Sequence, residues 1–356
     1  MVYKVVYIED QAADSVIHDL NQLGLDVEHC KPTSFSETTK NVDEMKPDLI
    51  LMDYRLMAGG GEVDAPSIAQ YYRSSFIDRP EQCTPIVLLS NDNKIHDYYR
   101  DFTSHDLFDF SISKENLSEN KEKYSSLMKE LINSYTEIAH LQDSNSSLVK
   151  LLSIPESIED DIDPRIIETL ERKKYKSSTY LTSSFILNNV VKPIGVLIGE
   201  DVLSARLGIS TKSEDWHSLL DKLKNWQYTG LYSETYKRWW AAGVEEWWSN
   251  QVDSKSHLRR LNSQEKLTLL NAKFEEFDLK KIDGDPQSIT NSFWTICQSS
   301  FVAVDPSEAF EIAIDLTQYP WIDSQFLSYE SVRSSDLIEK LTDFERIRYK
   351  EQARSL

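Results

Sequence analysis

The sequence predicts a doubly wound, five-stranded parallel α/β sheet followed by a mostly α-helical region that is rich in tryptophan. Residues 1–115 alternate short apolar runs with amphipathic stretches of roughly ten residues, which is the spacing of βα units. Three of the runs are almost wholly apolar, as expected for central parallel strands that are buried on both faces. All eight tryptophans come after residue 160. These observations predict two regions of different architecture.

Five runs are the predicted strands, and each is followed by a helix-like stretch. They are KVVYI (4–8), DVEHC (26–30), DLILMD (48–53), PIVLLS (85–90) and LFDFSI (107–112). In a doubly wound sheet, ligands bind outside the carboxyl ends of the strands, where the strand order reverses. The residues at these ends are therefore the candidates for a functional site.

Polar residues stand at four of these strand ends. The first strand is followed by Glu9 and Asp10, the third ends in Asp53, the fourth ends in Ser90, and Lys114 comes just after the fifth. Adjacent carboxylates repel each other unless a cation lies between them. Solvated charge at a strand end would explain any one of these residues alone. All five at one edge of a sheet indicate a site.

This order of residues resembles the receiver domain of two-component response regulators, a flavodoxin-like fold, over residues 1–120. The resemblance implies that Glu9 and Asp10 hold Mg²⁺ and that Asp53 is both a metal ligand and the phosphoacceptor. The backbone carbonyl of Arg55 would be a further ligand. Mg²⁺ prefers about six hard oxygen ligands, which these groups and water supply.

The same resemblance implies that Ser90 and Lys114 contact the oxygens of the phosphoryl group. The donor would be a phosphohistidine of a histidine kinase, and the product an aspartyl phosphate on Asp53. Any catalysis by the chain itself would be limited to phosphoryl transfer to its own aspartate and autodephosphorylation, so the sequence leaves open whether it is an enzyme.

The sequence departs from the receiver pattern at several positions. Met57 replaces the usual proline four residues after the acceptor, and Ser111 replaces the aromatic residue that often acts as a rotamer switch. The distance from Asp53 to Ser90 is also long for the family. We expect the extra length at the loop around residues 59–61 and in the stretch 76–84.

Between the two regions the sequence predicts a long helix and then an acidic linker. Apolar residues recur at three- and four-residue steps over residues 116–142. The helix is either a signalling helix or homodimer seam, or a helix packed on its own domain. IPESIEDDIDP (154–164) is acidic and poorly patterned. The predicted domains are a receiver at 1–120, a helix and linker at 121–160, and an output or interaction domain at 161–356.

The C-terminal region carries signals for helices and for a large aromatic core. Asp163-Pro164 and Asp305-Pro306 each place an N-cap before a first-turn proline, and Glu308 resembles a capping-box partner. The stretch 236–251 places tryptophans along one helical face. These rings either fill the core or form an aromatic protein-binding surface.

Charge argues against nucleic acid as a partner. The chain has a net charge of -20, and residues 1–120 hold 10 basic and 22 acidic residues, which leaves -8 for the remainder. Phosphate backbones require a basic surface. VLSARLGIS (202–210) resembles the start of a helix-turn-helix, but Glu214 stands where an apolar residue should lock the second helix. A glycine cap at Gly208 explains the pattern more simply.

Other features predict a cytoplasmic protein with no membrane segment. Three distant cysteines fit a reducing compartment, and no signal peptide is evident at the N-terminus. The longest apolar stretch, Phe185–Gly199, is interrupted by two Asn, a Lys and a Pro. The C-terminal half contains no P-loop, GxSxG or metal-ligand spacing.

The leading interpretation is a response regulator whose C-terminal region signals through a protein partner rather than DNA. One rival is a phosphate sink for a shared histidine kinase, as in some antiphage two-component systems. Another is an unphosphorylated pseudo-receiver that acts as an adaptor.

Overall fold

The computed structural model describes residues 2–58, 61–78, 83–91, 107–314, 319–335 and 337–355. The chain forms two compact units. The first comprises residues 1–152, 164–187 and 230–235, and the second comprises residues 153–163, 188–229 and 236–356. Each unit is made of three separate segments of the chain, so this division does not correspond to boundaries at single positions. The domain boundaries at residues 120 and 160 stay predictions.

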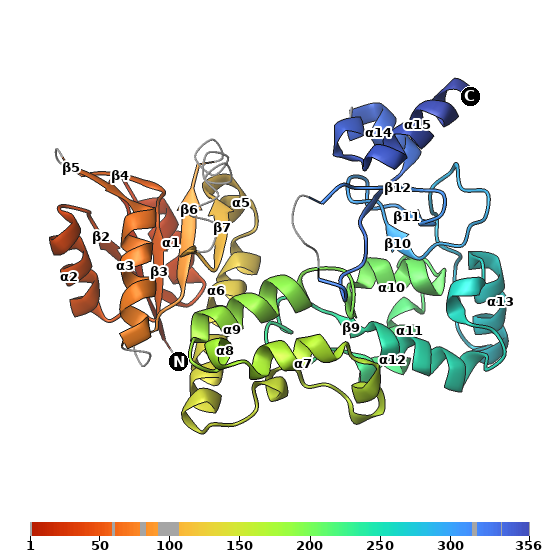
Figure 1. The fold of residues 1–356 in the computed structure, drawn as a ribbon, viewed down its shortest axis with the longest axis horizontal. Helices are drawn as coiled ribbons and strands as arrows, with labels where there is room; N and C mark the ends of the chain where they lie inside the picture. The colour runs from red at the N-terminus through yellow and green to blue at the C-terminus, as the bar shows by residue number, and fades with distance from the viewer. Residues whose placement is uncertain are drawn as a thin grey trace. The chain divides into compact units, whose positions relative to one another are not determined.

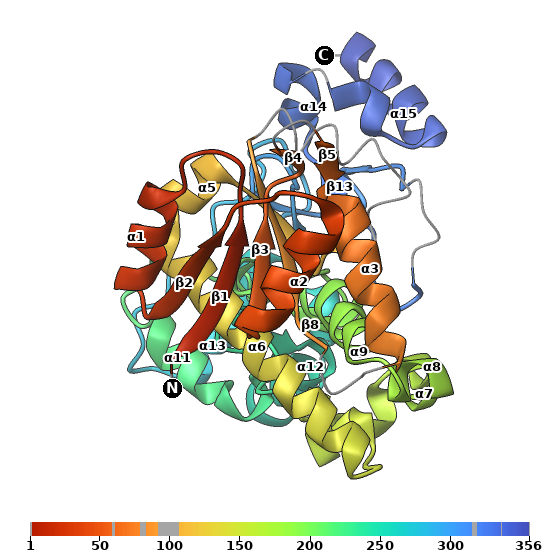
Figure 2. The same cartoon turned by 90° about the vertical axis from the view of Figure 1, so that its left-hand side faces the viewer.

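The first unit contains a five-stranded sheet in which all strands are parallel (Figures 1 and 2). The spatial order is β2-β1-β3-β6-β7. Strand β2 therefore lies on one side of β1, and β3, β6 and β7 follow on the other side. This is the flavodoxin-like order with its switch point between β1 and β3, and it confirms the predicted fold. The strands are β1 (Tyr3–Ile8), β2 (Leu25–Cys30), β3 (Leu49–Met52), β6 (Ile86–Ser90) and β7 (Phe110–Ser113).

Helices cover both faces of this sheet (Figure 2). Val42 of α2 and Ile68 and Tyr72 of α3 pack in one cluster with Val6 of β1 and Ile50 of β3. On the other face, α1 contacts α6. The strands are thus covered on both sides, which explains their uniformly apolar sequences. The helices are α1 (Asp14–Gln22), α2 (Phe35–Met45), α3 (Ala65–Asp78), α5 (Lys114–Glu119) and α6 (Lys121–Asp143).

An antiparallel hairpin follows β3 where the sequence predicted a long loop. It consists of β4 (Arg55–Ala58) and β5 (Gly61–Asp64), with Met57 opposite Glu62. A proline has no N–H to offer to a strand ladder, so its replacement by Met57 suits this hairpin. Part of the second predicted insertion, residues 79–82, lies outside the described residues.

The long helix packs within its own unit, as one of the two alternatives predicted. The buried face of α6 includes Leu127, Met128 and Leu131, and α6 contacts α9. The predicted continuous helix is broken at Asn120, whose φ of -129° and ψ of 42° separate α5 from α6. The unit also contains α7 (Pro164–Glu171), α8 (Lys173–Lys176), α9 (Thr179–Phe185) and a 3₁₀ helix (Leu148–Leu152). The start of α7 at Pro164 confirms the Asp-Pro signal.

In its described residues, the second unit combines short helices with three short antiparallel strand pairs. About half of the chain beyond the receiver-like part is helical. The strand pairs are β8 (Leu197–Ile198) with β9 (Trp239–Trp240), β10 (Thr295–Ile296) with β11 (Ala303–Val304), and β12 (Phe310–Glu311) with β13 (Phe326–Leu327). The helices are α10 (Glu200–Leu207), α11 (Trp216–Lys222), α12 (Ala241–Trp247), α13 (Ser263–Lys273), α14 (Tyr329–Ser335) and α15 (Asp343–Ser355).

The tryptophans of the stretch 236–251 form part of a core and not a binding surface. Trp216, Trp239, Trp247 and Trp248 all belong to the main buried cluster of the second unit. The interpretation as an exposed aromatic surface is therefore wrong. The predicted helix over 236–251 is also shorter than expected, because Trp239 and Trp240 form β9 and α12 begins at residue 241.

Two further sequence signals have opposite outcomes. Gly208 ends α10 in the left-handed conformation, with a φ of 71°, which confirms the glycine cap. Asp305 does not begin a helix: its carboxylate accepts hydrogen bonds from Ser307, and Glu308 accepts them from the backbone of residues 289 and 290. The predicted capping box is therefore wrong, because no helix begins at Asp305 and Glu308 accepts hydrogen bonds from a distant loop.

The acidic stretch that was expected to be a linker is packed. It contains a 3₁₀ helix (Glu156–Asp161), and Ile158 is fully buried. A search of the helices in the described ranges found none with the length and apolarity of a membrane span.

Candidate functional site

Glu9 is held at the end of β1 by four polar contacts. Its carboxylate accepts hydrogen bonds from the Tyr7 hydroxyl at 2.7 Å and from the Gln11 backbone N–H at 3.1 Å. Lys114 Nζ pairs with the same carboxylate. His29 Nε2 lies 2.9 Å from the Glu9 carbonyl oxygen. The side chain of Glu9 is completely buried, so the donors from Tyr7, Gln11 and Lys114 replace the water that its carboxylate needs.

Asp10 and Asp53 join Glu9 in one acidic cluster. One carboxylate oxygen of each residue lies within 4.8 Å of one from each of the others. Asp53 is completely buried at the end of β3, and Ser90 at the end of β6 donates a 2.5 Å hydrogen bond to its Oδ1. Asp10 Oδ1 is buried and has no hydrogen-bond partner among the described residues. The cluster therefore contains an acceptor that no described residue satisfies.

The charge of this cluster suits a divalent cation. Three carboxylates and the single ammonium of Lys114 leave two negative charges uncompensated among these four residues. Like charges this close repel each other, and a cation between them relieves the repulsion. Carboxylate oxygens are the ligands that Mg²⁺ and Ca²⁺ prefer. The residues present thus fit a hard divalent metal ion.

The fold brings together most of the predicted site residues. Lys114 is the first residue of α5, after the N-cap Ser113, and the end of β6 places Ser90 beside Asp53. Arg55 is the first residue of β4, two residues beyond Asp53. The role of its carbonyl as a metal ligand stays a prediction. Ser111 is half-buried in β7, so a small hydroxyl occupies the position that the receiver pattern gives to an aromatic ring.

Sequence reasoning missed two residues that position Glu9. Tyr7 and His29 were treated as parts of apolar strands. Residues two apart in a strand point to the same face, so the spacing of Tyr7 and Glu9 could have revealed their contact. Burial and the adjacent Glu9 carboxylate both raise the pKa of Tyr7, which keeps its hydroxyl protonated as a donor.

A second buried polar cluster anchors α3 and α6 at the opposite edge of the sheet. Asp109 accepts hydrogen bonds from Arg73 at 2.9 Å, from the Tyr135 hydroxyl at 2.6 Å and from the Ile86 backbone N–H at 2.8 Å. Burial alone would lower the pKa of Arg73, but Tyr135 and Asp109 outweigh it and raise this pKa. The cluster is a charge pair that is fully hydrogen-bonded, which buried charges require.

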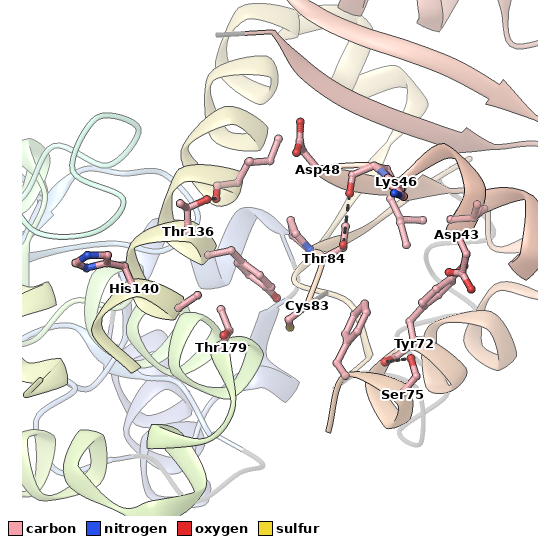
Figure 3. Close-up of a pocket in the computed structure, with 18 of the residues that line it drawn as sticks. Asp43, Lys46, Asp48, Tyr72, Ser75, Cys83, Thr84, Thr136, His140 and Thr179 are labelled. Carbon is pink, nitrogen blue, oxygen red and sulfur yellow. Dashed lines mark hydrogen bonds between the residues drawn. The ribbon is translucent and has the colours of Figure 1, made fainter. Parts of the chain in front are cut away.

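A cavity of about 800 Å³ also opens at this opposite edge (Figure 3). Asp43 and Tyr72 lie on one side of it, and Thr136, His140 and Thr179 lie on the other. Its walls include the residues just before β3 and β6. The cavity contains none of the predicted phosphoacceptor residues, which lie at the carboxyl ends of those strands.

Comparison with solved structures found receiver domains. The signal receiver domain of a modulated diguanylate cyclase from Desulfovibrio desulfuricans G20 is 18% identical, with 36% of this chain and 98% of that chain covered and a TM-score of 0.27. The chemotaxis response regulator CheY4 of Vibrio cholerae is 17% identical over 34% of this chain and 98% of that chain, with a TM-score of 0.26.

A third structure is the receiver domain of a sensor histidine kinase from Pseudomonas aeruginosa PAO1, with a magnesium ion coordinated in its active-site cleft. It is 21% identical over 32% of this chain and 86% of that chain, with a TM-score of 0.25. Scans against protein-family models and curated proteins found no match. The C-terminal part has no recognised match. About the first third of the chain has the flavodoxin-like fold, as its strand order shows.

Proposed function

We propose that this protein is a phosphoacceptor response regulator in which Asp53 receives a phosphoryl group from a phosphohistidine of a histidine kinase. The observation that supports this most strongly is the convergence of Glu9, Asp10 and Asp53 beside Ser90 and Lys114. A carboxylate oxygen of Asp53 forms the new O–P bond as the P–N bond of the donor breaks, and the donor imidazole recovers its neutral form by taking a proton.

Mg²⁺ is the proposed cofactor, with Glu9, Asp10, Asp53 and the carbonyl of Arg55 as its protein ligands. When bound, the ion would neutralise charge on the incoming phosphoryl group. Ser90 donates to Asp53 and would donate to a phosphoryl oxygen on it. Lys114 supplies a positive charge at the same edge of the sheet. Its ammonium would leave the Glu9 carboxylate and bind a phosphoryl oxygen instead.

For the second unit we propose a protein-contact output that does not involve DNA. Its acidic composition and the Gly208 cap in place of a helix-turn-helix support this. The proposed site of action is the cytoplasm. A phosphate sink is a second candidate, favoured by the half-buried Ser111, because a receiver without an aromatic switch suits storage of phosphate better than its reporting.

The test is intact mass of the full chain after incubation with acetyl phosphate and Mg²⁺. We expect one added phosphoryl group that hydroxylamine releases, as it does an acyl phosphate. Asp53→Asn keeps the shape of the side chain but removes the nucleophile and should gain none. Asp48→Asn is the matched control, because Asp48 caps the other end of β3 and accepts from the Lys4 backbone. Wild-type protein that gains no phosphate would favour the adaptor hypothesis instead.

A response regulator and a phosphate sink differ in what phosphorylation changes. Amide hydrogen exchange of the full chain should change in residues 188–229 and 236–356 after phosphorylation if the protein is a regulator. Exchange that changes only around Asp53 would support the phosphate sink.

A further inference from the structure

The second unit contains a polar cavity of about 650 Å³ that lies outside the phosphoacceptor site. This volume is within the range of small-molecule sites, roughly 300–1,000 Å³. Trp294, Pro320 and Trp321 give it apolar walls, and side chains of both charges line it. The cavity belongs entirely to the second unit, so the inference below does not depend on the proposed phosphoacceptor function.

Arg206 is the most unusual group in this cavity. Only 4% of this residue is exposed, yet its guanidinium has one hydrogen-bond acceptor among the described residues, Asp323 at 2.7 Å from Nη2. Its Nε is buried, and no group in the described ranges accepts a hydrogen bond from it. A guanidinium has five N–H donors, and buried donors are normally satisfied. Arg206 is therefore a buried cation with donors left over for an oxyanion.

Arg206 and a second arginine, Arg259, both lie over the ring of Trp294. The guanidinium carbons of Arg206 and Arg259 lie 4.5 Å and 4.9 Å from the ring centroid of Trp294. Arg259 is exposed, and in the described part of the chain it forms no ion pair. Two cations that share one ring repel each other, and a carboxylate between them would relieve this repulsion. Burial and Arg259 both lower the pKa of Arg206, in agreement with this arrangement.

The other charged residues that line the cavity indicate which further groups a ligand must carry. Four carboxylates line the cavity against the two arginines, so its formal charge is -2 when His257 is neutral. A phosphate dianion would be repelled by that balance. Glu246 already accepts from Trp226 and Ser157, whereas Glu245 is exposed and raises the pKa of Arg206 through its charge. Glu245 is thus placed to accept a cationic group of a ligand whose anionic group is on Arg206.

We propose that this cavity binds a basic α-amino acid, either free or as the C-terminal residue of a peptide. Its α-carboxylate would bind Arg206 and Arg259, its basic side chain would face Glu245, and the indoles of Trp294 and Trp321 would cover its methylene groups. Such a ligand compensates both the unsatisfied guanidinium and the excess of carboxylates, which neither a simple anion nor a simple cation does.

The test uses the full chain labelled with 5-fluorotryptophan, with the ¹⁹F signal of Trp294 assigned from a Trp294→Phe variant. The probes are L-arginine, the tripeptide Gly-Gly-Arg, L-argininamide and inorganic phosphate. We expect L-arginine or the tripeptide to shift the Trp294 signal saturably, and the tighter of the two identifies the free or the peptide form. L-argininamide should bind at least about tenfold more weakly, because it lacks the charged acceptor for Arg206.

Variants separate a binding site from a structural role. Arg206→Gln and Arg259→Gln should each weaken binding about tenfold or more, whereas Arg260→Gln, an exposed neighbour that does not line the cavity, should not. If Arg206→Gln fails to fold, Arg259→Gln still decides the matter, because Arg259 is exposed. The proposal is overturned if neither L-arginine nor the tripeptide binds, if L-argininamide binds equally well, or if phosphate binds more tightly.

Discussion

The hydroxyl of Ser90 lies 2.5 Å from Oδ1 of Asp53, and both side chains are completely buried. This bond joins the carboxyl ends of β6 and β3 at the proposed phosphoacceptor. A hydrogen bond to a charged acceptor contributes about 1.5–3 kcal/mol, so its loss corresponds to a factor of roughly 10–100 in a rate or equilibrium constant.

We therefore expect Ser90→Ala to slow phosphorylation of Asp53 by acetyl phosphate at least about tenfold, because the hydroxyl no longer orients the carboxylate or meets the phosphoryl oxygen. Ser90→Thr retains the hydroxyl and should stay within a few-fold of wild type. The rates come from a time course of intact mass, with circular dichroism as the check on folding. Equal rates for Ser90→Ala and wild type would exclude this role.

Lys114 and Asp10 should have opposite effects on metal affinity. Lys114 pairs with Glu9 and so competes with a cation for the same carboxylate. Lys114→Ala should bind Mg²⁺ several-fold more tightly, and Asp10→Ala should bind it at least several-fold more weakly, because the one removes a positive charge and the other a ligand. Calorimetric titration of the full chain measures both.

Lys121→Ala is the matched control for that titration, since Lys121 pairs with Asp19 away from the cluster. Its affinity for Mg²⁺ should not change. Weaker binding by Lys114→Ala would show that the Lys114–Glu9 pair holds the site together and does not compete with the metal.

Removal of Asp109 should strongly destabilise the first unit. Asp109→Ala would leave the Arg73 charge buried without its carboxylate and the Tyr135 hydroxyl without its acceptor. We expect the free energy of unfolding to fall by about 3–5 kcal/mol, the usual effect of breaking a buried ion pair. Urea unfolding of the full chain, followed by far-UV circular dichroism, measures the loss. Glu44→Ala, which breaks the exposed pair with Lys40, should cost less than about 1 kcal/mol.

The buried Lys266 should make the stability of the second unit depend on pH. It is completely buried, donates to the Phe293 carbonyl at 3.2 Å, and burial lowers its pKa from 10.5 to about 7. Between about pH 7 and pH 10.5 the unfolded chain binds more protons at this residue than the folded chain. The contribution of Lys266 to stability therefore rises with pH across this window and is least favourable below pH 7.

Lys266→Met keeps the volume but cannot be charged. Its stability relative to wild type should be greatest near pH 7 and should decline towards pH 10, by at most ~1.4 kcal/mol per pH unit. The measurement is urea unfolding at several pH values, followed by tryptophan fluorescence. A difference that is independent of pH would contradict the lowered pKa.

The receiver-like sheet was predictable because its signals are local. Val5 to Ile8 and Leu49 to Met52 are buried on both faces, and a strand in such a position must be apolar at every residue. The carboxyl ends of adjacent parallel strands lie at one edge, so Glu9, Asp10 and Asp53 were expected to meet. Gly208 was likewise predictable, because a helix cap depends on the residue itself.

Only the tertiary structure decided features that depend on partners far along the chain. Trp240 is in a strand because it pairs with Leu197, and no helical period in its own segment could show this. Glu308 bonds a loop some twenty residues earlier instead of capping a helix. Arg206 donates a hydrogen bond to Asp323, which lies 117 residues further along the chain. The sequence by itself determined the strands and the acidic edge, whereas long-range packing decided the second unit and its cavity, because those contacts depend on residues that local patterns do not connect.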